Sequence, residues 1–349
     1  MKKTLLATAI IGALGASAAA QAATVYDQDG TRLDVYGRIA MGIEGGGVPA
    51  NDGASTSAEF RDVFSRLGLR MSQDVTSDLT AFGHVEWRFQ ADGGDNRFNA
   101  FTETRQSYIG LESNQFGTIQ GGNFDSFYNS FVSLPFDVYL NQGLEFQGHP
   151  KQSRGDSIGY YTPDLNGFTA ALQLKHYSDR GEDLDRDSTV VAAQGGVRYQ
   201  EGPVTVGLGF IEDVERGEGT GEMIYGLIGS YAIDDQLTLR AGFETQDRND
   251  DPNTAARLAA DDRDNGFDSY GLGLTYTTGP WAFNADVYHI DRRGADDSNS
   301  WAAGAYYKVS SNFDVFAELY DGDAPSTRDA QIRDFSDDVY WLTGARYLF

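Results

Sequence analysis

Residues 33–43 read LDVYGRIAMGI, and this stretch decides the fold because its side chains alternate strictly between two faces. The first face holds apolar residues and glycine: Leu33, Val35, Gly37, Ile39, Met41 and Ile43. The second face holds Asp34, Tyr36, Arg38 and Ala40. A period of two predicts a β-strand with one face in apolar surroundings and the other facing polar surroundings.

The same alternation recurs along the whole chain. It is found in Leu79–Gln90, Pro203–Ile211, Gln236–Glu244, Pro280–His289 and Asn312–Tyr320. Each stretch is close to the roughly 10 residues that a tilted strand needs to cross the hydrocarbon core of a membrane. These even lengths favour a transmembrane barrel over a soluble β-sandwich, which has no such requirement.

The connections between these stretches are of two kinds. Short turns rich in Asp, Asn, Gly and Pro are predicted at Asp74–Asp78, Ser113–Gly117, Pro163–Gly167, Gln200–Pro203, Ile233–Gln236, Thr278–Pro280 and Ser310–Asn312. Long polar loops are predicted at Gly45–Glu59, Ala91–Thr102, Asn123–Gln152, Arg180–Thr189, Asp213–Gly221, Asp247–Asn265, Asp291–Asn299 and Asp321–Phe335. These seven turns and eight loops join sixteen strands and leave both termini on the turn side. We therefore expect an all-β, antiparallel, 16-stranded transmembrane barrel, which is wide enough for an aqueous channel.

The amino-terminal stretch predicts export from the cytoplasm. Lys2 and Lys3 precede an apolar run, Leu5–Leu14, and Ala20-Gln21-Ala22 forms a cleavage site for residues 1–22 as a signal peptide. The remaining residues, 23–349, are expected to form a single barrel domain without a transmembrane helix, because they contain no run of 18 apolar residues. Aromatic pairs at strand ends, Tyr160-Tyr161, Tyr306-Tyr307 and Tyr340-Trp341, are placed as membrane-interface girdles would be.

The composition limits the possible partners. The formal net charge of −25 argues against nucleic acid, which is bound by basic surfaces. The chain has no cysteine, so no disulfide framework or thiol chemistry is expected. The four histidines show no metal-ligand spacing, and Asp261–Gly266 has Arg263 where a calcium loop needs an oxygen ligand. We predict neither a metal nor a cofactor.

The loop 123–152 is unlike the others. Its thirty residues hold two prolines, five phenylalanines and three acids. So long a connection is usually functional or disordered, and so many aromatic rings must be buried somewhere. We therefore expect it to fold back into the barrel and narrow the water-filled lumen.

Several motifs resemble the general-diffusion porins of Gram-negative outer membranes. They are VYDQDGTRLDVYGR at 25–38, FSRLGLR at 64–70, SYIGLES at 107–113 followed by QFGTIQGG, and the carboxyl-terminal RYLF. The resemblance covers essentially all of residues 23–349 and implies a trimer in the outer membrane, in contact with lipid and lipopolysaccharide. It also implies that the third loop faces a basic cluster on the lumen wall and that ions and small hydrophilic solutes pass between them.

The resemblance carries over to individual residues. The basic wall corresponds to Arg38, Arg66, Arg105 and Arg154, and alternation adds Arg70. Arg66 and Arg70 alternate with Val63, Ser65, Leu67, Leu69 and Met71. Arg105 and Arg154 have the parity of apolar neighbours, so packing of the folded loop against the wall would have to accommodate them. On the loop, LPFD at 134–137 resembles the family's tip, and the acids expected to face the lumen are Asp137, Glu145 and Asp125, in that order.

Charge and motif leave three functions open. The acidic loops favour a passive channel with weak cation selectivity. A substrate-specific porin for sugars or phosphate is the alternative, although the inward aromatics Tyr36, Tyr288, Phe316 and Tyr320 predict no continuous track. A lipase-type enzyme would need Ser157 of GDSIG on a strand-to-helix turn, whereas the residues that follow predict a turn.

Overall fold

The computed structural model describes residues 22–46, 58–92, 101–141, 143–144, 146, 155–177, 190–214, 219–260, 265–293, 296–321 and 339–349. The expected signal peptide, except Ala22, lies outside these residues, as does at least a part of each predicted long loop. None of the helices in the described part is long and apolar enough to span a membrane.

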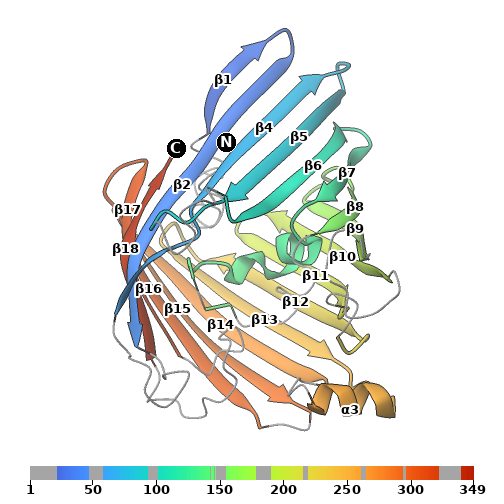
Figure 1. Ribbon diagram of the computed structural model, residues 1–349, viewed down its shortest axis with the longest axis vertical. Helices are drawn as coiled ribbons and strands as arrows, with labels where there is room; N and C mark the ends of the chain where they lie inside the picture. The colour runs from blue at the N-terminus through green and yellow to red at the C-terminus, as the bar shows by residue number, and fades with distance from the viewer. Residues whose placement is uncertain are drawn as a thin grey trace.

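One antiparallel sheet holds eighteen strands (Figure 1). They are β1 (Ala23–Gln28), β2 (Thr31–Gly46), β3 (Glu59–Asp62), β4 (Arg66–Asp74), β5 (Leu79–Arg88), β6 (Glu103–Ser113), β7 (Gly117–Asn123), β8 (Asp156–Tyr161), β9 (Phe168–Tyr177), β10 (Val190–Glu201), β11 (Val204–Glu212), β12 (Met223–Ala232), β13 (Leu237–Gln246), β14 (Phe267–Thr278), β15 (Trp281–Arg292), β16 (Ser298–Lys308), β17 (Phe313–Asp321) and β18 (Val339–Leu348). The described connections also hold the helical segments η1 (Asn129–Ser133), η2 (Leu134–Phe136) and α3 (Pro252–Ala260).

The sheet closes on itself between its first and last long strands. β18 pairs with the second half of β2, from Arg38↔Leu348 to Gly46↔Tyr340. β1 pairs with the first half of β2, so β1 and β18 follow one another along the same side of that strand. If β1 is counted with β18, and β3 with β4, the described strands occupy sixteen positions around a closed barrel, which confirms the expected fold class.

Alternation separates the two faces of the wall. On β12, Tyr225 and Leu227 are 53% and 51% exposed, whereas Ile224 and Ile228, which flank them, are fully buried. The exposed face of the strands is apolar, as a lipid-facing surface requires. The inner face carries the polar and charged side chains, among them Arg38, Glu86, Arg240, Glu244, Asp286, Glu318 and Arg346.

The seven predicted short turns are all confirmed, because each lies between two paired strands. At the turn between β12 and β13, the Asp234 carboxylate accepts the backbone N–H groups of Gln236 and Leu237, both at 2.8 Å. These two bonds lower the pKa of Asp234. One turn was not predicted: Asp29 and Gly30 adopt φ of 53° and 74°, which makes the tight hairpin between β1 and β2.

The second long strand is interrupted, which the sequence did not predict. Phe64 has a φ of 56° and separates β3 from β4. Ser65 Oγ donates to the carbonyl oxygen of Ala40 at 3.2 Å and accepts its N–H at 3.0 Å. The expected outward alternation of Val63 and Ser65 is therefore wrong, and both side chains are buried.

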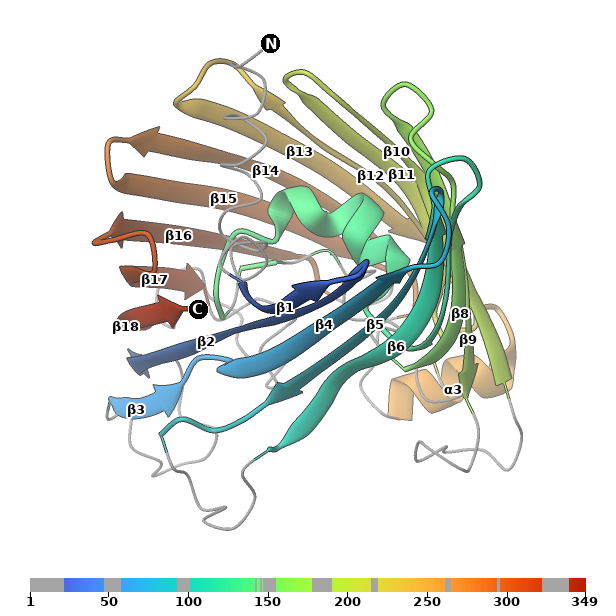
Figure 2. The ribbon, with the colours of Figure 1, turned by 90° about the horizontal axis from the view of Figure 1, so that it is seen from above.

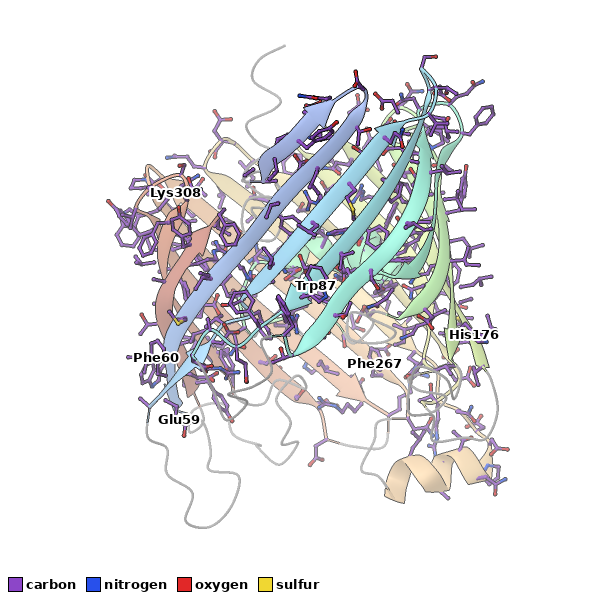
Figure 3. All side chains as sticks on the ribbon, turned by 45° about the horizontal axis from the view of Figure 1, so that its top comes forward. Glu59, Phe60, Trp87, His176, Phe267 and Lys308 are labelled. Atoms are coloured by element: carbon purple, nitrogen blue, oxygen red, sulfur yellow. The ribbon has the colours of Figure 1, made fainter. Side chains whose placement is uncertain are left out.

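The aromatic pairs divide between the two faces, because adjacent residues of a strand point in opposite directions. Tyr160 is 42% exposed, as an interfacial residue would be, whereas Tyr306 is 3% exposed and lies in the lumen. Figure 3 shows Glu59 and Phe60 at the end of the wall where the long loops begin and Lys308 near the opposite end.

At the seam between β2 and β18, we expect Gly37 to be sensitive to substitution. Gly37 exchanges two backbone hydrogen bonds with Phe349, at 2.8 and 3.1 Å, and a Cβ on Gly37 would overlap the Phe349 ring. We expect Gly37→Val to destabilise the folded barrel by roughly 1–3 kcal/mol through overpacking. The measurement is the temperature at which the compact band of an unheated sample disappears on a denaturing gel.

The control is Gly83→Val in β5. A Cβ there would have its nearest neighbour, the Met71 methyl, at an ordinary 3.5 Å. An equal fall in the temperature at which the compact band disappears in the two variants would mean that the seam has no special role in stability.

Candidate functional site

A cluster of arginines lies on the inner face of neighbouring strands. Arg38 of β2 is directly opposite Arg66 of β4, which is opposite Arg88 of β5. Directly opposite residues of antiparallel strands share a face, so these three guanidinium groups gather on one part of the wall. Arg38 Nε donates to the carbonyl oxygen of Phe64 at 2.9 Å, and the Arg88 guanidinium lies 4.7 Å from the centre of the Phe64 ring.

Arg105 joins this cluster through a β-bulge. The pairing of β5 and β6 shifts between Glu86↔Gln106 and Trp87↔Thr104, which leaves Arg105 as the extra residue. A bulge breaks the period of two and redirects side chains. Arg105 therefore reaches Glu86 at 2.5 Å and Asp125 at 2.9 Å, although simple alternation would have turned it outward.

Glu86 is the acid that holds the cluster together. Its carboxylate lies 3.6 Å from Arg66 Nε, accepts from Arg105, and accepts the Tyr36 hydroxyl at 2.7 Å. The Arg70 guanidinium lies 4.3 Å from the centre of the Tyr36 ring, and the Tyr36 hydroxyl also forms a hydrogen bond with His84 Nε2. The arginines are thus fixed by stacking and by charge-assisted hydrogen bonds.

The sequence-predicted residues have different outcomes. Arg38, Arg66, Arg70 and Arg105 lie in or next to this cluster, whereas Arg154 and Glu145 lie outside the described residues. Asp125 lies at the base of the long loop and pairs with Arg105 instead of standing across from it. Asp137 is half-buried and ends η2. These roles remain predictions.

Other charged residues of the inner wall were not selected from the sequence. Glu86 and Arg88 have the inward parity of His84, so alternation could have identified both. Arg346 of β18 is 2% exposed and pairs with Asp314 at 2.8 Å. Arg240 of β13 makes a buried ion pair with Asp286 of β15. For Arg346 and Arg240, the only signal in the sequence was their inward position in the alternation of their strands.

The segment Phe124–Asn141 of the long loop contacts inward-facing side chains, and Figure 2 shows it within the ring of strands. Its first half is held by wall amides: Gln173 Oε1 accepts the N–H of Phe127 at 2.8 Å, and Gln194 Oε1 accepts that of Tyr128 at 3.1 Å. The Tyr128 hydroxyl donates to Glu244 at 2.5 Å. Burial and the adjacent Glu244 carboxylate raise the pKa of Tyr128, which keeps this donor protonated.

The second half of the segment is held by strands on the far side of the barrel. Glu318 of β17 accepts the N–H groups of Leu140 and Asn141, at 2.7 and 3.3 Å. Asn284 of β15 donates to the carbonyl oxygen of Val138 at 3.0 Å. Wall side chains thereby supply the partners that this backbone cannot find in a sheet ladder.

Glycines on the inner wall make room for the segment. A Cβ on Gly226 would overlap the Tyr128 hydroxyl, and one on Gly209 would overlap the Val132 side chain. Phe136 of the segment packs on Tyr288 of the wall, with ring centres 5.7 Å apart, and on Phe146 of the same long loop, with ring centres 4.8 Å apart. Such burial is worth about 25 cal/mol for each Å² of apolar surface removed from water.

Ser157 does not occupy a nucleophile elbow. It lies inside β8, where its hydroxyl accepts the Gln173 amide at 3.0 Å, and β8 continues to Tyr161 without a helix. The strand-to-helix turn that this motif requires is therefore absent at Ser157.

Fold and inner surface together define a transmembrane barrel with a polar, charge-lined interior. The profile of the Gram-negative porin family matches residues 7–325. The chain therefore belongs to this family and is an outer-membrane channel.

Individual relatives agree with this assignment. The chain is 28% identical to a monosaccharide porin of a Halomonas species, over 99% of this chain and 91% of the relative. It is 24% identical to outer membrane protein F of Serratia marcescens, over 91% and 77%. Among solved structures, an anion-selective porin from Comamonas acidovorans has a TM-score of 0.70 at 18% identity, with 91% of this chain and 100% of that one covered.

The close fit at Gly226 predicts the effect of a side chain there. We expect Gly226→Val to displace the segment from β12 and break the Tyr128–Glu244 bond, whose loss is worth about 1–3 kcal/mol. Local opening should then rise by roughly a factor of 10 or more, measured as faster amide hydrogen exchange in residues 126–138. Gly121→Val is the control, because a Cβ there would have the Ser157 carbonyl oxygen as its nearest neighbour, at 3.8 Å. Unchanged exchange in Gly226→Val would contradict the described docking.

Proposed function

We propose that this chain is a passive diffusion channel for ions and small hydrophilic solutes, with weak cation selectivity. The observation that carries the proposal is the inner surface. Six arginines (Arg38, Arg66, Arg70, Arg88, Arg105 and Arg346) project inward from one part of the wall, and an internal segment is attached to strands of the opposite part.

The mechanism follows from electrostatics across the lumen. Fixed guanidinium groups on one side and carboxylates on the other create a transverse field, which low-dielectric walls strengthen. On the segment, we assign the carboxylate role to Asp137, which makes no ion pair among the described residues. Polar solutes and ions align in such a field and pass, whereas an apolar solute has to displace oriented water at a cost.

The preference for cations rests on the balance of charge. The chain has 52 acidic and 27 basic residues. Within the arginine cluster itself, Glu86 and Asp125 offset part of the positive charge. We therefore expect the arginines to orient solutes and the acidic surroundings to set the sign of the ion preference.

Planar-bilayer recordings test this assignment. Under a KCl gradient we expect a reversal potential that favours K⁺, a shift toward chloride in Asp137→Asn, and a shift toward K⁺ in Arg66→Ala. Each variant changes one unit charge in the field, and effects of this kind depend on ionic strength, so they should shrink at about 1 M salt. Asp235→Asn, on an exposed turn, serves as the control. Chloride preference in the unmodified protein would overturn the selectivity, and unchanged currents in both lumen variants would overturn the residue assignment.

A substrate-specific porin is the second candidate. It is favoured by the relative from Halomonas that is named a monosaccharide porin, at 28% identity over nearly the whole chain. Saturable block of the ion current by one solute distinguishes this candidate from a general channel, in which small solutes reduce the current only in proportion to their concentration.

We also propose that three copies form the working channel in contact with lipopolysaccharide, as the family resemblance implies. An unheated, detergent-solubilised sample should give a mass of three chains by light scattering and a single monomer band after boiling. A mass of one chain before heating would contradict the trimer but not the barrel.

A further inference from the structure

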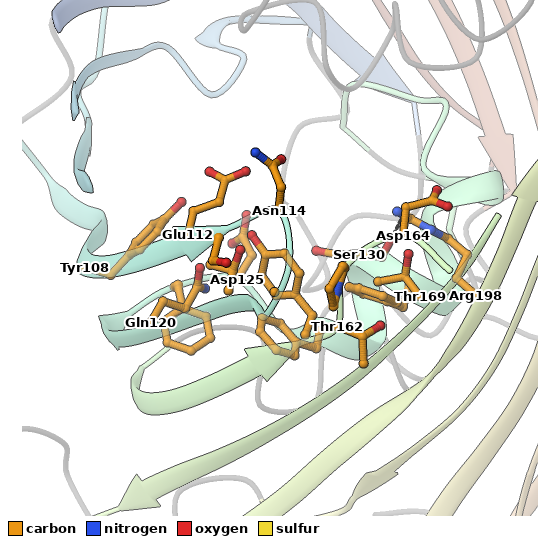
Figure 4. A pocket seen from close by; sticks show the side chains of 18 of the residues that line it. Tyr108, Glu112, Asn114, Gln120, Asp125, Ser130, Thr162, Asp164, Thr169 and Arg198 are labelled. Carbon is orange, nitrogen blue, oxygen red and sulfur yellow. Dashed lines mark hydrogen bonds between the residues drawn. The ribbon is translucent and has the colours of Figure 1, made fainter. Parts of the chain in front are cut away.

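A cavity of about 590 Å³ lies between the internal segment and strands β6 to β10. It is bordered by two of the short turns, at Asn114–Gly117 and Thr162–Asp164, so it belongs to the turn side of the barrel. Figure 4 shows Tyr108, Glu112, Gln120 and Asp125 at one end and Thr162, Asp164, Thr169 and Arg198 at the other. It meets the arginine cluster and its partners through Asp125 and Gln106, which bond to one another, and through Tyr108, whose hydroxyl lies 2.8 Å from His84 Nδ1.

The floor of the cavity is aromatic. Tyr108, Phe124 and Phe127 follow one another with ring centres 5.7 and 5.5 Å apart. Tyr161 continues the row, 5.7 Å from Phe127 and 6.3 Å from Phe131. The three phenylalanines are buried, whereas both tyrosines are only half-buried, so the tyrosines are the rings that a solute can reach. Rings packed in this way form a rigid apolar surface.

The walls of the cavity offer unused hydrogen-bonding groups. The Gln120 side chain is 8% exposed, lines the cavity and has no hydrogen-bond partner among the described residues. The oxygen and nitrogen of this carboxamide are open to the cavity, where they can accept from and donate to a solute or water. The exposed Glu112 lies beside it on the paired strand β6.

The other end of the cavity presents a fixed donor. The Arg198 guanidinium lies 4.7 Å from the centre of the Phe131 ring and donates to the Ser130 carbonyl oxygen at 3.1 Å. It makes no ion pair with a carboxylate among the described residues, so its remaining N–H groups are available to a solute. Asp164 and Thr169 also line this end.

From this combination we propose that the cavity is a binding subsite for a monosaccharide. A pyranose has flat C–H faces that pack on aromatic rings and a rim of hydroxyls that both donate and accept. Donors and acceptors of both charge signs surround the aromatic row, which suits a neutral polyhydroxylated ring better than an ion. This proposal deepens the second candidate function, a substrate-specific porin, and rests on the channel function because the solute enters through the lumen.

The test uses ion current through the full-length protein in planar bilayers. D-glucose should reduce the current saturably, whereas sorbitol, which has similar hydroxyls but no ring, should reduce it only in proportion to its concentration. Gln120→Leu removes the carboxamide at similar volume and should raise the half-blocking glucose concentration roughly three- to tenfold. Asp235→Asn on a distant turn is the control and should leave that concentration unchanged.

The outcomes separate the two proposals. Absence of any ion current in the properly folded protein would remove the channel function itself. A normal current that glucose and sorbitol affect equally would overturn the subsite and leave the channel. Saturable block by glucose that Gln120→Leu leaves unchanged would place sugar binding elsewhere in the lumen and likewise overturn this assignment.

Discussion

The structure depends on one constraint: a backbone that crosses an apolar layer must satisfy all of its hydrogen bonds within the protein. An open sheet cannot do this, because its edges leave a row of donors and acceptors unpaired, so the sheet has to close. Closure at β2 and β18 fixes the alternation of every strand, since one face must meet lipid along its whole length. The outer face is thereby restricted to apolar residues, and the charged residues that distinguish this chain, such as Arg346 and Glu318, are confined to the interior.

The same constraint governs the internal segment, although it belongs to no sheet. Its N–H groups are accepted by Gln173, Gln194 and Glu318, and its carbonyl at Val138 is met by Asn284. Several inward polar residues therefore hold the segment and are not free to contact solutes. Glu318 and Glu244, for example, accept hydrogen bonds from the segment, so these carboxylate oxygens are already engaged.

Alternation, even strand lengths and turn composition predicted the barrel and the short turns, and alternation predicted the inward placement of Arg38, Arg66 and Arg70, because these signals depend on each segment's own residues. Alternation failed where a neighbouring strand changes the period. Arg105 turns inward through a bulge that exists only in the pairing with β5, and Phe64 interrupts a strand because Ser65 binds back to Ala40. The sequence predicted that the loop folds back into the barrel but not where it docks, since the glycines that accept it, such as Gly226, lie about a hundred residues away in sequence.

The ion pair between Arg105 and Asp125 supports the proposal that Asp137, and not Asp125, is the described loop acid that acts on solutes. Asp125 stands at the base of the segment, next to the arginine wall, and its carboxylate also accepts the Gln106 amide. Its charge is thus compensated locally and contributes little to a field across the lumen, because the field of a close ion pair decays faster with distance than that of a single charge. Asp137 follows η2, well beyond that anchor, and has no ion pair in the described part of the chain. Asp125 is therefore neutralised at the base of the segment, whereas Asp137 keeps its negative charge without an ion pair among the described residues. This difference gives the segment a charge opposite to that of the arginine wall.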